Sequence, residues 1–271
     1  MKGMILGAAI GLACVAHAGS ASADISLRLA CKLGNPRCVE SVIQEMEQRF
    51  RPLARRCDHD AIFSLLYLRT TQKFDETLLA LGYSGVRAVV REDALFADYY
   101  FRAHDAYRQR RGFVPPAWQI ALSAAEQRAV SGIGNALLGM NAHIQRDLPF
   151  VLFELDRRGH PVSYEDHNRI NVFLAQVDAA EELAARFDPI FTAGIDPAVL
   201  AQLIANWREL AFLNYLRLRD APDLRAWLTV AADIERYAAE MARAFAQQTA
   251  YPAGTDSAAR DAHCSAARDA D

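Results

Sequence analysis

The chain has 271 residues, a formal charge of −3 and 52% hydrophobic residues. These values suit one globular domain of ordinary size. A mildly acidic chain without a basic run argues against nucleic acid as the main partner. Beyond the N-terminus no segment reaches the roughly 20 apolar residues that a transmembrane helix needs, so none is expected in the mature chain.

The N-terminus has the three parts of a secretory signal peptide. Lys2 carries the positive charge, an uncharged apolar run covers residues 4–15, and small residues follow up to Ala23. Cleavage after Ala23 is favoured because polar Asp24 follows, and a site after residue 18 is the alternative. A lipid anchor at Cys14 is disfavoured, since a glycine stands where such anchors have a large aliphatic residue. The sequence thus predicts a signal peptide at residues 1–23 and a periplasmic or secreted location.

Four cysteines remain after cleavage, namely Cys31, Cys38, Cys57 and Cys264. An even number in an exported chain predicts two disulfides, which could connect in three ways. Gly34-Asn35-Pro36 can turn the chain between Cys31 and Cys38, so we pair these two and expect Cys57 to bind Cys264. Free thiols are the alternative. A zinc site is disfavoured, because no two cysteines have C-x₂-C spacing.

Apolar residues recur at helical spacing along most of the chain, which predicts an all-α, single-domain bundle of about eight helices within residues 24–250. The expected helices cover residues 37–50, 58–81, 84–111, 117–127, 129–158, 163–187, 197–219 and 224–248. Capping signals support the later ones: Ser163 with Asp166, Asp196 before a proline, and Asp223. Residues 251–271 are small and polar, so we expect a disordered tail apart from any tether at Cys264.

One polar pair interrupts an otherwise apolar helix. His143 and Asp147 lie four residues apart, which places their side chains one turn apart on the same helix face. Pro149 has no N–H, and its ring disfavours the usual bond to the Gln145 carbonyl. We therefore expect a kink directly after the pair, with a carbonyl oxygen left free for water, an ion or a side chain.

An imidazole and a carboxylate at this spacing form half of a divalent-metal site, which facing helices can complete. The candidates for the second half are Asp98, His104, Asp105, Asp166 and His167. Asp98 and His104 are the preferred additional ligands, and we expect at least one of the five to lie within reach of the pair. The alternative is structural: His143 and Asp147 form a buried hydrogen-bonded pair that orients Arg146 or caps the kink.

The stretch from Gly139 to Leu148, GMNAHIQRDL, resembles the hallmark G-M-N-A-H-I-x-R-D-L of a family of helical bacterial proteins, domain of unknown function five-nine-nine-five. Further segments resemble its flanking helices, at residues 61–71, 94–103, 163–177 and 206–219. The resemblance covers most of residues 58–230. It implies a helical fold and draws attention to Asn141, His143, Arg146 and Asp147 without implying a reaction.

A second resemblance is to zinc-dependent phospholipase C and the single-strand nucleases of the same helical fold. Those exported proteins hold a metal cluster with H-x-x-x-D pairs on long helices, and His143 with Asp147 is similar to one such pair. The chain departs from the pattern, because it has no second clear pair and its mature form would start with Asp24 instead of a metal-binding tryptophan. The resemblance therefore implies one or two ions instead of three.

Together these features predict an exported metal-assisted hydrolase of a small or lipid-like ester or phosphoester, with zinc or manganese as the cofactor. His143, Asp147, Asp98 and His104 would bind the metal, and a metal-bound water would attack. Arg146 would stabilise the developing negative charge, and Asp105 is the second catalytic candidate. The rival prediction is a non-catalytic bundle that binds an apolar small molecule or a protein partner.

Overall fold

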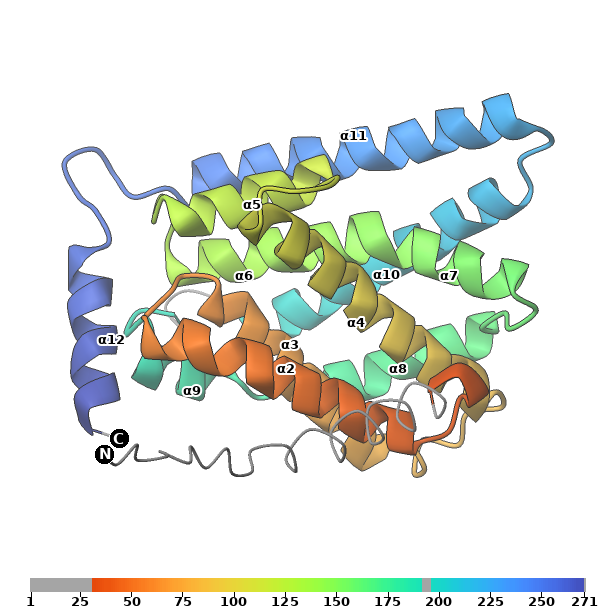
Figure 1. Ribbon diagram of the computed structural model, residues 1–271, viewed down its shortest axis with the longest axis horizontal. Coiled ribbons are helices and arrows are strands. Elements are labelled where there is room, and N and C mark those ends of the chain that lie inside the picture. Colours follow the sequence, from red (N-terminus) through yellow and green to blue (C-terminus); the bar gives the residue numbers. More distant parts are fainter. Residues whose placement is uncertain (1–30, 192–195, 271) are drawn as a thin grey trace, which may run out of the picture.

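The computed structural model describes residues 31–191 and 196–270 (Figure 1). The predicted signal peptide, residues 1–23, and the expected start of the domain at residue 24 lie outside this part. Within it, eleven α-helices and one π-helical segment make up the chain, with a single isolated β-bridge between Val130 and Ala250. The predicted all-α class is confirmed. None of the helices described is long and apolar enough to span a bilayer.

The helices and their bounds are α2 (Arg37–Arg55), α3 (Ala61–Thr77), α4 (Val86–Arg108), α5 (Pro116–Glu126), α6 (Gly132–Met140), η1 (Asn141–Asp147), α7 (Leu148–Arg157), α8 (Tyr164–Leu174), α9 (Ala180–Arg186), α10 (Pro197–Arg219), α11 (Leu224–Gln248) and α12 (Ala258–Ala270). The number exceeds the eight expected for three reasons. The segment 129–158 divides into α6, η1 and α7, the segment 163–187 divides into α8 and α9, and the tail contains α12.

A continuous helical rod of α6, η1 and α7 runs through the middle of the bundle (Figure 1). It contacts α3, α4, α5, α10 and α11, which surround it. Gly139 permits a close approach, because a Cβ atom there would lie 2.3 Å from the ring of Phe63 on α3. The rod is therefore enclosed on several sides, and its polar residues must find partners inside the core.

Three helix starts follow the capping signals of the sequence. The side chains of Ser163, Asp196 and Asp223 accept hydrogen bonds from backbone N–H groups in the first turns of α8, α10 and α11. Asp166 does not reciprocate in a capping box. Its carboxylate accepts bonds from the backbone N–H and hydroxyl of Ser84 and from the N–H of Gly85, so it joins α8 to the start of α4.

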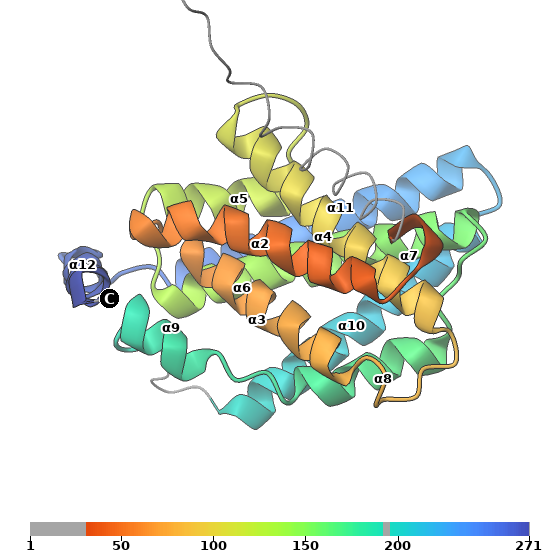
Figure 2. The same cartoon turned by 60° about the horizontal axis from the view of Figure 1, so that its bottom comes forward.

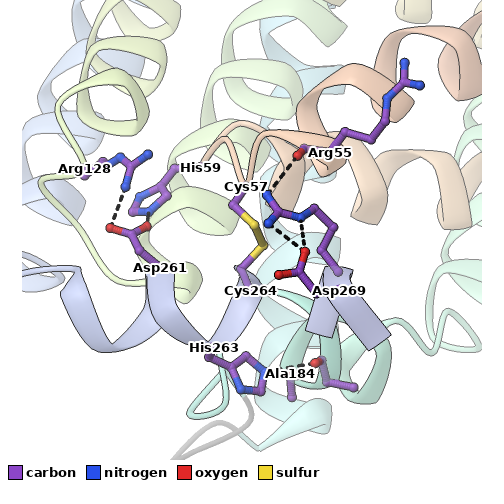
Figure 3. The surroundings of a disulfide bond; sticks show 11 residues. Arg55, Cys57, His59, Arg128, Ala184, Asp261, His263, Cys264 and Asp269 are labelled. Atoms are coloured by element: carbon purple, nitrogen blue, oxygen red, sulfur yellow. Dashed lines mark hydrogen bonds and ion pairs between the residues drawn. A yellow bond between two sulfur atoms is a disulfide. The ribbon is translucent and has the colours of Figure 1, made fainter. Parts of the chain in front are cut away.

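Both predicted disulfides, Cys31–Cys38 and Cys57–Cys264, are confirmed. The second bond fastens α12 to the end of α2 (Figure 3). Nearby, His59 Nε2 lies 3.0 Å from Asp261 Oδ1 on α12. The expectation of a disordered tail was wrong, because this alanine-rich segment forms a helix and is held at several points. We refer to α12, the Cys57–Cys264 bond and the His59–Asp261 contact as the clamp.

Candidate functional site

The π-helical segment η1 carries the polar pair predicted from the sequence. Its hydrogen bonds widen to i→i−5 spacing, as in the bond from the Leu148 N–H to the His143 carbonyl. Pro149 follows immediately and cannot donate to the Gln145 carbonyl. The chain thus accommodates this proline by widening the turn that presents His143 and Asp147, and π turns of this kind occur frequently at functional sites.

His143 and Asp147 form a buried pair within one hydrogen-bond network. The distance from His143 Nδ1 to Asp147 Oδ2 is 3.3 Å. The same carboxylate accepts bonds from Trp118 Nε1 at 2.8 Å and from Arg146 Nη1 at 2.9 Å. Arg146 is bound in turn by Glu235 on α11 at 2.6 Å. Asp147 is therefore fully engaged by protein groups, which fixes the orientation of the imidazole.

Aromatic side chains surround the imidazole on its other sides. Phe96 of α4 stacks on it with ring centroids 3.4 Å apart and planes 4° apart. The ring of Tyr67 on α3 lies at 4.5 Å and that of Phe63 at 5.9 Å, both edge-on. These contacts leave the His143 ring no room to rotate, so its second nitrogen points in one fixed direction.

That second nitrogen, Nε2, is buried and has no hydrogen-bond partner among the described residues. The Asp147 carboxylate can only accept a hydrogen bond from Nδ1. We therefore assign the proton of the imidazole to Nδ1 and a free lone pair to Nε2. Burial lowers the pKa of His143, and Asp147 opposes this only in part. The imidazole is thus neutral near pH 7, and Nε2 can accept a hydrogen bond or bind a cation.

A pocket of about 500 Å³ lies against this imidazole. It is bordered by α3, α6, α9 and α10, which Figure 2 shows close together on one side of the molecule. The apolar side chains that line it include Phe63, Leu66, Ile133, Leu183, Leu200 and Ile204. The volume and apolar lining are those of a small-molecule site.

Four polar residues near this pocket were not predicted as site residues: Tyr67, Glu92, Asp93 and Arg208. Arg208 and Tyr67 line the pocket, and all four line a smaller cavity next to it. The sequence does carry a signal for Arg208, because Ile204, Ala211 and Phe212 share its helix face at i−4, i+3 and i+4. A charged residue on such a face must point into the core.

The structure does not bring the predicted second ligands to His143 and Asp147. Asp98 is exposed and pairs with Arg102, and Asp105 accepts two bonds from Arg49. The reason is helical phase: Phe96 and Tyr100 are the α4 residues that face His143, and Asp98 and Asp105 lie about 180–200° around the helix from Phe96.

The other three candidates have partners elsewhere as well. His104 lies 3.6 Å from Asp60, and His167 bonds to the Arg208 carbonyl at 3.0 Å, while Asp166 binds the start of α4. Over residues 31–191 and 196–270, no three His, Cys, Asp or Glu side chains are grouped to hold a metal ion. Of the predicted site residues, His143 alone is among the described residues that line the pocket, and a metal site here stays a prediction.

One known family matches the chain. The profile of the Family of unknown function (DUF5995) matches residues 39–248, which is more than half of the chain and includes every residue of the pocket. No curated protein and no solved structure gives a match. The resemblance to zinc-dependent phospholipase C therefore stays a prediction.

Proposed function

The chain belongs to the DUF5995 family, and on this premise we propose that it binds an apolar small molecule in the pocket beside His143. One observation carries the proposal: a pocket of about 500 Å³ with mainly apolar walls is lined by His143, whose buried Nε2 has no hydrogen-bond partner among the described residues. Buried polar atoms are nearly always hydrogen-bonded. A ligand with a hydroxyl or similar donor would satisfy Nε2 while its apolar body fills the pocket.

The two disulfides support an exported protein, since such bonds persist in oxidising compartments. A periplasmic or secreted binder would take up a poorly soluble molecule outside the cytoplasm. The burial of apolar ligand surface would supply the affinity, at roughly 25 cal/mol per Å² removed from water. The fixed imidazole would supply selectivity.

A metal-assisted hydrolase of an ester or phosphoester is the second proposal. Its support is also the free Nε2 of His143, which could take a zinc or manganese ion. It is the weaker of the two, because Arg146 and Asp147 are bound by other protein groups and the second half of the site is missing from the described side chains. Elemental analysis of protein purified without chelators tests it, and a stoichiometric metal would favour the enzyme.

Dye binding with matched variants of α10 tests the binder. An uncharged solvatochromic naphthalene dye should bind the wild type with an increase in fluorescence. Ala201 lines the pocket, whereas Ala198 is exposed one turn earlier on the same helix. Ala201→Phe should weaken dye binding at least tenfold because it fills the pocket, and Ala198→Phe should leave it unchanged.

Thermal melts of both variants would verify that each is folded. Equal dye affinity in the two variants, or no saturable binding to the wild type, would contradict the proposed function.

A further inference from the structure

A second, smaller cavity of about 60 Å³ adjoins the pocket. The two share the wall residues Tyr67, Thr70, Phe96, Leu174 and Arg208. A single ligand can therefore extend from the apolar pocket into the smaller cavity, which we call the polar chamber. Its walls are mainly apolar, like those of the pocket, but they also include Arg208, two acidic residues and the hydroxyl groups of Tyr67, Thr70 and Thr71.

Arg208 is the positive charge of the chamber. It is only 4% exposed, and its bonds go to neutral groups: Nε to Asn171 Oδ1 at 3.0 Å and Nη2 to the His167 carbonyl at 2.8 Å. Among the described residues it forms no ion pair with a carboxylate, and its Nη1 makes no hydrogen bond. The nearby Glu92 acts on Arg208 only at a distance, and burial still lowers the pKa of this guanidinium, so a bound anion would offset the cost of burying its charge.

Three further groups in the chamber have unused hydrogen-bonding atoms. Tyr67 Oη, Glu92 Oε2 and Asp93 Oδ2 are buried and have no partner in the part of the chain described. Burial raises the pKa of Glu92 to about 7, and burial together with the neighbouring Glu92 raises the pKa of Asp93 well above its ordinary value. The Tyr67 hydroxyl and the protonated Asp93 carboxyl are donors, and Glu92 is a donor below about pH 7, so the chamber presents donors around one positive charge.

A single anionic acceptor group complements such a site. A carboxylate can accept a hydrogen bond from the free Nη1 of Arg208 and has lone pairs left for hydroxyl and carboxyl donors. The small volume of the chamber suits a group of this size. An apolar chain attached to it would pass between Tyr67 and Arg208 into the pocket and reach His143.

We propose that the polar chamber binds the carboxylate of a long-chain carboxylic acid, ion-paired with Arg208, while the acid's hydrocarbon chain lies in the pocket. This inference rests on the proposed binding function and names its ligand class. The acidic residues Glu92 and Asp93 would stay protonated in the complex, because a second negative charge in the chamber would repel the ligand.

Competition of three twelve-carbon compounds against the naphthalene dye tests the inference on the full-length, disulfide-bonded protein. Dodecanoate should displace the dye at a concentration at least tenfold lower than 1-dodecanol, which has the same chain without the charge. Dodecyl phosphate, with a larger and more highly charged head, should compete more weakly than dodecanoate. Equal potency of acid and alcohol, or a preference for the phosphate, would overturn the assignment.

Two variants test whether the preference for dodecanoate over dodecanol depends on Arg208. Arg208→Gln should weaken dodecanoate at least tenfold and dodecanol much less, and Glu92→Gln should keep the preference for the acid because an amide also donates. Thermal melts would show whether Arg208→Gln is folded. If it is not, Arg208→Lys, which keeps the charge and loses the guanidinium, should show a smaller loss in the same direction. Loss of the acid preference in Glu92→Gln but not in the Arg208 variants would overturn the proposal. Absence of dye binding by the wild type would instead reject the proposed function itself.

Discussion

Two buried histidines, one at the clamp and one at the pocket, differ in how their ring nitrogens are used. His59 at the clamp and His143 at the pocket are both at most 3% exposed. In His59 both ring nitrogens have partners, since Nε2 donates to Asp261 and Nδ1 accepts from Arg260 at 3.2 Å. In His143 only Nδ1 has a partner among the described residues, and the residue lines a pocket.

The acids of the two regions differ in the same way. Burial alone would raise the pKa of Asp261 at the clamp, but bonds from Ser257, His59 and Arg128 outweigh it and lower that pKa. Glu92 in the polar chamber has no hydrogen-bond donor among the described residues, and burial raises its pKa to about 7 although the charge of Arg208 opposes this. Bonded groups such as Asp261 hold helices together, whereas Glu92 beside a cavity has a buried oxygen without a partner among the described residues.

The largest expected effect is on the clamp. Replacing both Cys57 and Cys264 by serine removes a cross-link across a sequence separation of 207. The chain-entropy relation predicts a loss of about 5 kcal/mol in the free energy of unfolding, against about 2–3 kcal/mol for the short Cys31–Cys38 loop. Urea unfolding of both double variants would measure the difference. Dye affinity should stay unchanged in each, and a clear drop in the Cys57/Cys264 variant would contradict the separation of the two regions.

The pH dependence of stability should have opposite signs at Glu92 and Asp261. The pKa of Glu92 is higher in the folded state, about 7 against an ordinary 4.5, so its stabilising effect exists at low pH and is lost as the pH rises through 7. Glu92→Gln should therefore stabilise the protein by up to about 3 kcal/mol above pH 7 and have little effect below about pH 4.5.

Asp261→Asn is the matched comparison. Because the folded-state pKa of Asp261 is lowered, its contribution is present near neutral pH and disappears as the pH falls below its ordinary pKa. The asparagine variant should be less stable than the wild type at pH 7 and similar to it in strong acid. Melting temperatures at several pH values would show whether the two variants diverge as expected or shift together.

Replacing each histidine should lower the free energy of unfolding by a smaller and different amount. His59→Leu leaves Arg260 and Asp261 each short of one bond and should cost about 2–3 kcal/mol. His143→Leu should cost about 1 kcal/mol, because Asp147 keeps its bonds from Trp118 and Arg146. Urea unfolding would measure both losses. A ligand with a hydroxyl donor should lose affinity only in the His143 variant, and an equal loss in both would contradict the role of Nε2.

Local signals in the sequence were sufficient where a helix has its own start and stop. The bounds of α10 and α11 agree with the prediction because Asp196-Pro197 and Asp223 mark their beginnings. The break between α8 and α9 was missed, since residues 175–179 contain neither glycine nor proline. The helix α12 was missed because its order depends on a disulfide and on contacts with distant residues, which no local pattern encodes.

Only the part of the site that lies within a single helix was predicted from the sequence. The i,i+4 spacing correctly placed His143 against Asp147, because that contact lies within one helix. Its surroundings depend on which faces of α3, α4 and α10 turn inward. The phase of α4 could have been read from Val89, Glu92 and Phe96, which share one face. That reading would have directed attention to Glu92 instead of Asp98.

The Cys57–Cys264 bond can form only after the Cys31–Cys38 bond has had time to form. A polypeptide emerges from its ribosome or translocation channel with the N-terminus first, so Cys31 and Cys38 can meet while most of the chain is still missing. The partner of Cys57 lies 207 positions later and becomes available only when almost the whole polypeptide has been released. During that interval Cys57 remains a thiol next to two earlier cysteines with which it can pair incorrectly. Correct oxidation therefore depends on forming the short bridge early and on an exchange of wrong pairings before the last helix docks.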